Sequence, residues 1–308
     1  MLSSDEHHYT NHAHPIKFMI IGDSISHGRE GDWTWRYRIW EWFRHEGIHT
    51  ASFVGPYRGT WHPPGEPSEP LARPPPELLL EGEDPSPKPT LLRTEGGYAP
   101  GVSPEFLFSD HHAAAWGLQA MQAKDLIAEQ IADYQPDVCL VGLGFNDLAW
   151  GVSNAEGTLR SIKTFLSQAR SKKPDCKFAV ANVPHRDHSD TRLADMADEY
   201  NKMLAEAVCE WSTEVSPVAL VYLAEVYEPD RASYDGIHPN ALGEYLVALA
   251  FSRTLIRAFS IGRHELRIPK CSLGAEHKVE TRLVDRLCLE TDAGLEVYLD
   301  FCDGGSGD

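Results

Sequence analysis

The chain has 308 residues, 42% of them hydrophobic, which is enough to bury one large α/β core. Its 46 acidic and 28 basic residues give a formal net charge of −18. Binding to a nucleic-acid backbone or an anionic membrane needs clustered Lys and Arg, so this balance argues against both kinds of partner. No apolar run approaches the roughly 20 residues of a membrane span, so none is expected.

The first 15 residues are polar and acidic, and we predict a flexible N-terminus over residues 1–15. They lack the basic start and apolar stretch of a secretory signal, which predicts a cytoplasmic protein unless a leader has been removed. Four histidines in this segment could bind a metal ion, but such a cluster is more typical of a mobile terminus. They are His7, His8, His12 and His14.

Strand-like and helix-like segments alternate between residues 16 and 261, which we interpret as one α/β domain. Short apolar runs predict the strands Ile16–Gly22, Thr50–Val54, Asp137–Gly142, Lys177–Asn182 and Pro217–Leu223. Helical patterns lie between them, at Trp33–His45, Gln119–Tyr134, Ala155–Ser171, Thr191–Trp211 and Ala241–Phe259. This alternation predicts a central parallel sheet covered by helices on both faces.

Two regions interrupt the alternation. Pro56–Pro104 holds 13 of the 21 prolines and almost no periodic apolar pattern, so we predict an insertion. It is either a solvated loop or an ordered rim of a binding site, since long ordered loops are often functional, and Trp61 and Tyr57 favour some packing. Residues 262–308 predict a small β-rich extension and tail, with strand-like segments at His264–Ile268, Val279–Leu289 and Leu295–Phe301.

The six cysteines are widely spaced, and none forms a CxxC pair of the kind that binds zinc or carries out redox chemistry. Three lie in apolar runs and are expected to be buried free thiols: Cys139, Cys176 and Cys209. Four tryptophans at helical spacing are expected in the core: Trp33, Trp35, Trp40 and Trp42.

A serine follows the first predicted strand, in the sequence GDSIS at residues 22–26. α/β proteins bind ligands at the edge of the sheet formed by the carboxyl ends of the strands, where this serine is expected. Gly, Asp and Ser are, however, also ordinary turn residues. A serine nucleophile needs a histidine held by a carboxylate, and Asp235 and His238 supply both after the last strand. We predict a catalytic triad of Ser24, His238 and Asp235; a helix-capping turn is the alternative for residues 235–240.

A third polar loop, GLGFND at residues 142–147, follows the predicted strand Asp137–Gly142 and is expected at the same edge of the sheet as Ser24. The Asn146 amide there could donate to a developing oxyanion, whereas the alternative is a loop selected for turn geometry. Asp23 and Asp147 are expected to brace their loops through backbone hydrogen bonds and not to act as acids or bases.

These three sequences, GDSIS, GFND and DGIHPN, resemble blocks I, III and V of the SGNH or GDSL-like hydrolase superfamily in order and spacing. The resemblance extends from Ile16 to about Phe259. It implies a flavodoxin-like three-layer α/β/α domain that uses no metal or other cofactor. It also implies an oxyanion hole made by the Ser24 N–H, the N–H of a block II glycine and the Asn146 side chain.

The block II glycine is assigned to Gly117, because residues 112–117 precede the helix that leads into the GFND strand. Gly117 lies 29 residues before Asn146, which leaves room for that helix and strand. The pair Gly96 and Gly97 remains an alternative, and Gly55 is a weaker one. The interval between blocks I and II is unusually long because of the proline-rich insertion, so the substrate class stays open.

The resemblance implies an esterase that cleaves an O-acyl ester, including an O-acetyl ester, of a carbohydrate or small metabolite through an acyl-serine intermediate. Trp150, His185 and Arg186 are candidate substrate-binding residues, and simple loop solvation is an equal alternative for the last two. An acyltransferase or a catalytically silent binding module would share the fold, although every motif residue is present. The sequence does not predict the oligomeric state.

Overall fold

The computed structural model describes residues 15–62, 96–186 and 191–269. Its centre is a five-stranded parallel sheet in the order β2-β1-β3-β4-β5, the order of flavodoxin-like folds. The strands are β1 (Lys17–Gly22), β2 (Ser52–Phe53), β3 (Val138–Gly142), β4 (Lys177–Ala181) and β5 (Val218–Val221). All five fall within the predicted segments, and the predicted α/β class is confirmed.

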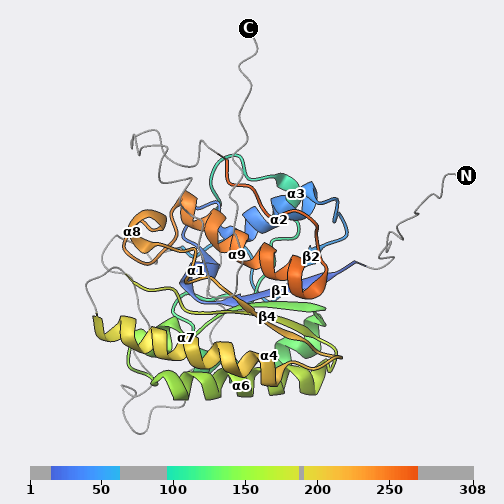
Figure 1. Ribbon diagram of the computed structural model, residues 1–308. Coiled ribbons are helices and arrows are strands. Elements are labelled where there is room, and N and C mark those ends of the chain that lie inside the picture. The colour runs from blue at the N-terminus through green and yellow to red at the C-terminus, as the bar shows by residue number, and fades with distance from the viewer. Residues whose placement is uncertain (1–14, 63–95, 187–190, 270–308) are drawn as a thin grey trace, which may run out of the picture.

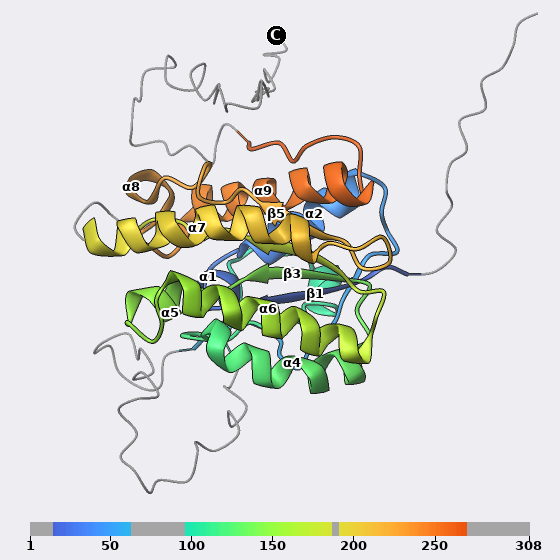
Figure 2. The same ribbon diagram turned by 60° about the horizontal axis from the view of Figure 1, so that its bottom comes forward.

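Long helices cover both faces of the sheet (Figures 1 and 2). On one face lie α2 (Trp35–His45) and α9 (Ala241–Phe259), and on the other α4 (Ala120–Tyr134), α6 (Ala155–Lys172) and α7 (Thr191–Trp211). Side chains of a strand alternate between the two layers: Phe18 and Ile20 pack with α2 and α9, whereas Met19 and Ile21 pack with the other three helices. The result is a three-layer α/β/α sandwich.

Four short helices were not predicted: α1 (Ser24–His27), α3 (Pro104–Leu107), α5 (Phe145–Ala149) and α8 (Pro229–Ala232). Segments of four or five residues are too short to show a 3.6-residue period in the sequence. Two of them matter for function, because α1 begins two residues after β1 and α5 begins three residues after β3. They place Ser24 and Asn146 at one edge of the sheet.

Two expectations were wrong. His264–Ile268 forms no strand; it is an irregular segment fixed to α2, where Leu266 is buried and the Trp42 indole donates to the His264 carbonyl (2.8 Å). Cys209 is exposed, because α7 is amphipathic and buries the neighbouring Val208 and Trp211 on its other side. The rest of the predicted extension and the N-terminal segment lie outside the described residues.

Other core expectations are met. Cys139 and Cys176 are buried, with their sulfur atoms 3.5 Å apart. Trp35, Trp40 and Trp42 are buried on α2, and Trp33, which precedes this helix, is half-buried. Among the helices that the structure describes, none has the length and apolar character to cross a membrane.

The two ends of the proline-rich insertion pack against the domain. Isolated bridges join Trp61 to Arg29, Thr60 to Gly96, and Tyr57 to His112. These pairs lie beside α1, so residues 56–62 and 96–104 border the edge of the sheet that carries Ser24. The middle of the insertion is outside the described residues.

Candidate active site

Ser24, His238 and Asp235 form a continuous chain of hydrogen bonds although they come from opposite ends of the domain. The Ser24 Oγ lies 2.9 Å from His238 Nε2, and His238 Nδ1 lies 2.6 Å from Asp235 Oδ2. A histidine with its Nδ1–H on a carboxylate presents an unprotonated Nε2 to the hydroxyl. The arrangement can therefore take the proton of Ser24.

The nucleophile loop is shaped by its neighbours in the sequence. Asp23 caps α1 by accepting from the Ile25 N–H (3.0 Å), which turns the chain sharply after β1. A side chain at Gly22 would place its Cβ 2.3 Å from the Ser26 Oγ, so the close approach here requires glycine. Ser24 is the first residue of α1, and its N–H donates to no acceptor in the described residues.

The loop with the histidine is fixed by its own polar atoms. Asp235 Oδ1 accepts from the N–H groups of Ile237 and His238, and Asn240 caps α9 by accepting from Leu242 and Gly243. The helix cap is therefore Asn240, which leaves the Asp235 carboxylate for His238. Burial alone would raise the pKa of Asp235, but the hydrogen bonds from His238 and from the two N–H groups outweigh it and lower this pKa.

A backbone segment and an amide complete the site. Residues 113–118 run beside the end of β1, with the Ala113 N–H on the Ile20 carbonyl and the Ala115 N–H on the Gly22 carbonyl. Gly117 follows with φ of +77°, a conformation that favours glycine, and its N–H has no acceptor in the described residues.

The Asn146 amide lies against the same segment. One of its Nδ2 hydrogens goes to the Leu118 carbonyl (3.1 Å), so the second hydrogen stays available. Gly96, one of the alternative block II residues, already donates its N–H to the Thr60 carbonyl and so has no N–H left for an oxyanion. The geometry therefore agrees with Gly117 in the predicted role.

The two remaining acids of these loops act as braces, as expected. Asp147 accepts from the first N–H groups of α4, at Ala120 (2.7 Å) and Met121 (3.0 Å). Burial raises the pKa of Asp147 to about 6 and that of Asp23 to about 7. Among the described residues, neither carboxyl forms a hydrogen bond with Ser24 or with the ring of His238.

Two aromatic rings stack on His238, and no motif in the sequence predicted them. Trp116 stacks on the imidazole with ring centroids 4.6 Å apart, and Tyr234 lies 5.8 Å away on the same histidine. Trp61, from the insertion, stacks on Trp116 at 4.4 Å. The only sequence signal was adjacency, because Trp116 precedes Gly117 and Tyr234 precedes Asp235.

The three predicted substrate-binding residues lie apart from these contacts. His185 Nε2 is 2.7 Å from the Asp198 carboxylate on α7, and Arg186 is exposed. Trp150 is half-buried at the end of α5. None lines the small cavity beside Ser24, so their roles stay predictions.

That cavity has room for little more than one water molecule and is lined by both catalytic loops, including Ser24, Trp116, Tyr234 and His238. A larger cavity, of about 650 Å³, lies away from the site between α2 and residues 264–269. Within the described ranges no group of three His, Cys, Asp or Glu side chains is arranged to hold a metal ion.

Comparison with protein families gives a match over part of the chain. Residues 95–246 match the GDSL-like lipase/acylhydrolase family. The matched range contains Gly117, Asn146, Asp235 and His238; Ser24 precedes it, on the far side of the insertion. No curated protein sequence matches the chain.

Several solved structures share the fold. A carbohydrate esterase family 3 structure from Talaromyces cellulolyticus has a TM-score of 0.59 at 23% identity, over 80% of this chain and 98% of that one. A family 3 carbohydrate esterase from Clostridium thermocellum gives 0.56 at 19%, over 80% and 99%. A putative GDSL-like lipase from Parabacteroides merdae gives 0.52 at 14%, over 80% and 97%.

The family match and the shared fold agree with the motifs that carry the resemblance. Ser24 lies outside the matched range, but the fold brings it beside the matched residues, because β1 pairs with β3 in the sheet. The solved structures show the shared fold, and the match of residues 95–246 identifies the chain as an ester hydrolase of the SGNH, or GDSL-like lipase/acylhydrolase, type.

Proposed function

We propose that the chain hydrolyses an O-acyl ester, with O-acetyl favoured, of a carbohydrate or other small molecule through an acyl-serine intermediate. Ser24 is the nucleophile, His238 the general base and Asp235 the orienting carboxylate. The observation that carries the proposal is the hydrogen-bond chain from the Ser24 hydroxyl through both ring nitrogens of His238 to Asp235. A serine hydroxyl is a weak nucleophile without such a base.

In the first half-reaction, His238 Nε2 takes the hydroxyl proton while Ser24 Oγ bonds to the ester carbonyl carbon. The resulting imidazolium then gives this proton to the alcohol oxygen as the ester C–O bond breaks. In the second half, His238 takes a proton from water while the water oxygen attacks the acyl carbon. The imidazolium then returns this proton to Ser24 Oγ as the bond between Oγ and the acyl carbon breaks, which releases the carboxylic acid. Asp235 accepts the Nδ1–H throughout and stabilises the imidazolium.

The carbonyl oxygen becomes negative in both tetrahedral intermediates and needs donors that are already in position. The Ser24 N–H, the Gly117 N–H and the second Nδ2 hydrogen of Asn146 each have no other acceptor among the described residues. All three groups lie beside the carboxyl ends of β1 and β3. We assign the oxyanion hole to these three groups.

Two observations support a sugar-like alcohol and an acetyl group. Tyr234, 44% exposed, and the half-buried Trp61 offer aromatic faces beside His238, and such faces suit the apolar faces of sugar rings. Solved carbohydrate esterases, and an acetyl esterase mutant solved with an acetate ion, share the fold.

The test is a panel of p-nitrophenyl esters of increasing acyl length, followed by acetylated sugars, with acetate release measured directly. We expect activity to be greatest on acetyl esters and to be absent in Ser24→Ala. An active-site fluorophosphonate should modify Ser24 in the wild type. Labelling of another residue, or normal turnover by Ser24→Ala, would overturn the assignment of the nucleophile; preference for long acyl chains would overturn the acetyl assignment.

A further inference from the structure

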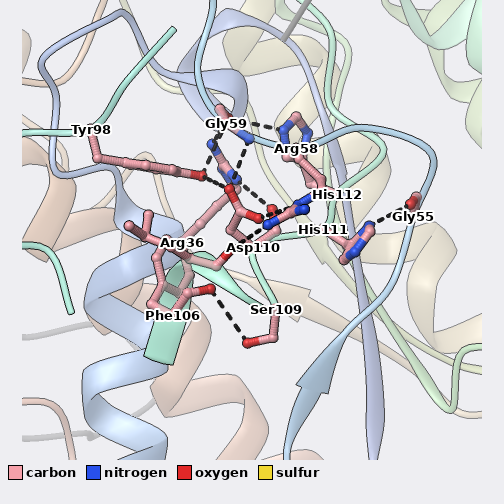
Figure 3. Close-up of polar contacts among 11 residues, drawn as sticks. Arg36, Gly55, Arg58, Gly59, Tyr98, Phe106, Ser109, Asp110, His111 and His112 are labelled. Carbon is pink, nitrogen blue, oxygen red and sulfur yellow. Dashed lines mark hydrogen bonds and ion pairs between the residues drawn. The ribbon is translucent and has the colours of Figure 1, made fainter. Parts of the chain in front are cut away.

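A buried polar cluster lies directly behind the catalytic loops and takes no part in the proposed mechanism. Its centre is Arg36 on α2, which is 1% exposed (Figure 3). The guanidinium makes its hydrogen bonds to main-chain carbonyls, at 2.6 to 3.2 Å: those of Ser26, His27, Gly59 and Asp110. A buried cation held this way links the end of α1 to the base of the insertion.

Two buried histidines, His27 and His112, lie beside this cluster with ring centroids 5.2 Å apart, and neither is exposed to solvent. His27 Nδ1 lies 3.2 Å from the Trp116 N–H, and His112 Nδ1 lies 3.1 Å from the Ala114 N–H. A backbone N–H can only donate, so both Nδ1 atoms must be unprotonated acceptors. Each ring therefore carries its proton on Nε2.

The N–H groups of residues 113–118 are nearly all used. Ala113 and Ala115 donate to carbonyls of β1, Ala114 and Trp116 donate to the two histidines, and Leu118 donates to Ala115. Among the described residues, the N–H of Gly117 alone in this segment has no acceptor. The two imidazoles thus set the loop conformation that leaves this one donor for a ligand.

The Nε2–H of His27 does not account for a histidine at this position. Its Nε2 is buried without a hydrogen-bond partner in the described residues, which costs free energy. The acceptor Nδ1 is therefore the atom that this histidine contributes. Burial first, and the Arg36 cation second, lower the pKa of His27 to about 3 and also depress that of His112, so both rings stay neutral acceptors.

We infer that His27 and His112 are positioning residues of the oxyanion hole, because their Nδ1 atoms fix the backbone segment that aims the Gly117 N–H at the substrate. This inference rests on the proposed function. Neither ring touches the substrate position, so both act through Trp116 and Ala114. A displaced Gly117 N–H weakens binding of the transition state more than binding of the ester, because the oxyanion exists only after attack.

His27 allows a sharp test, because Asn places its Oδ1 the same number of bonds from Cα as the histidine Nδ1. We expect His27→Leu to lower kcat roughly 10- to 100-fold with KM little changed, somewhat less than the loss of a whole oxyanion donor. His27→Asn should recover most of this loss. His27→Gln, which keeps an amide but moves the acceptor one bond outward, should stay impaired.

Two controls separate positioning from folding. Phe165→Leu on α6, a buried residue away from the site, should lower Tm without changing kcat at a temperature where the variant is folded. His111→Leu removes a neighbouring imidazole whose Nδ1 contact is to the Gly55 carbonyl, and kcat should not change. If His27→Leu does not fold, the comparison of Asn with Gln carries the test.

The outcomes are separable from those of the proposed function. Failure of a fluorophosphonate to label Ser24 in the wild type would reject the proposed nucleophile. If Ser24 is labelled, but His27→Leu keeps the wild-type kcat or His27→Gln equals His27→Asn, the positioning role is wrong and the triad stands. A loss of Tm without a loss of kcat would likewise make the histidine purely structural.

Discussion

The indole of Trp116 stacks on the imidazole of His238 with ring centroids 4.6 Å apart and planes 24° apart. The residue next to this indole is Gly117, the proposed oxyanion donor. The segment with Trp116 and Gly117 therefore packs on the general base and also carries the proposed donor to the oxyanion. A shift of this segment would disturb proton transfer and oxyanion binding together.

Trp61→Ala should change selectivity. Trp61 comes from the insertion and stacks on Trp116 at 4.4 Å, so it extends the aromatic surface beside His238. We expect kcat/KM for p-nitrophenyl acetate to stay within a few-fold of the wild type, whereas kcat/KM for an acetylated oligosaccharide falls. Phe108→Ala, which alters an exposed aromatic residue outside this stack, is the control. An unchanged ratio of the two kcat/KM values would make the described ends of the insertion a passive surface.

Ser24→Ala and His238→Ala should each abolish most turnover, and the double variant should be little worse than either, because triad members act as a unit. Rates with p-nitrophenyl acetate and Tm values measured for all three variants check this. The Tm should change little in Ser24→Ala, which removes a single hydroxyl, and should fall more in His238→Ala, which removes a ring stacked on Trp116. Additive losses would show that the serine and the histidine act independently.

Asn146→Ala should lower kcat roughly 10²- to 10³-fold, the range for loss of one oxyanion donor, with a smaller effect on KM. Its second role, a hydrogen bond to the Leu118 carbonyl, is expected to contribute about 1 kcal/mol to stability. Steady-state kinetics and urea unfolding separate the two effects. A change confined to KM would make Asn146 a binding residue for the substrate's ground state.

Asp147→Ala should destabilise the fold by about 1 to 2 kcal/mol, because the carboxylate caps two N–H groups of α4 from another element. Asp147→Asn retains an acceptor and should lose less. Neither variant should change the shape of the pH–rate profile, since Asp147 is a brace. Loss of one limb of that profile in Asp147→Asn would instead make this carboxyl a proton donor or acceptor in the reaction.

The sequence predicted the sheet, the five long helices and the loops that meet at its edge, because these depend on local patterns. A run such as Ile16–Gly22 is apolar at almost every position only when it is buried on both faces. The meeting of Ser24 with His238 followed from the strand direction, since parallel strands end at one edge. Periodicity and order along the chain were sufficient for this part.

The remaining features depend on contacts between distant residues, which no local pattern carries. Arg36 reads as a polar position of an amphipathic helix, yet it is buried because four carbonyls from three segments surround it. The alternation at His264–Ile268 looked like a strand, but no neighbouring strand pairs with it in the described residues. His27 and His112 gain their roles only when β1 and the block II segment lie side by side.

The neutral state of His27 also predicts how stability depends on pH. Its pKa falls from 6.5 in the unfolded chain to about 3 in the folded chain. Between pH 3 and pH 6.5 the unfolded state therefore binds a proton at this residue and the folded state does not. Acidification below pH 6.5 therefore favours unfolding through this residue. In His27→Asn that contribution is absent, while His112 titrates in both proteins and cancels in the comparison.

We expect the free energy of unfolding of the wild type, minus that of His27→Asn, to fall as the pH is lowered from 7 toward 4. The limiting slope is about 1.4 kcal/mol per pH unit, the value for one proton. Urea unfolding of both proteins at pH 7, 6, 5 and 4 measures the difference directly. His111→Leu, compared with the wild type in the same way, is the control, since His111 is only half-buried. A stability difference that is constant over this range would mean that folding does not lower the pKa of His27. The ring would then be protonated below pH 6.5, and its Nδ1 would not remain an acceptor for Trp116 there.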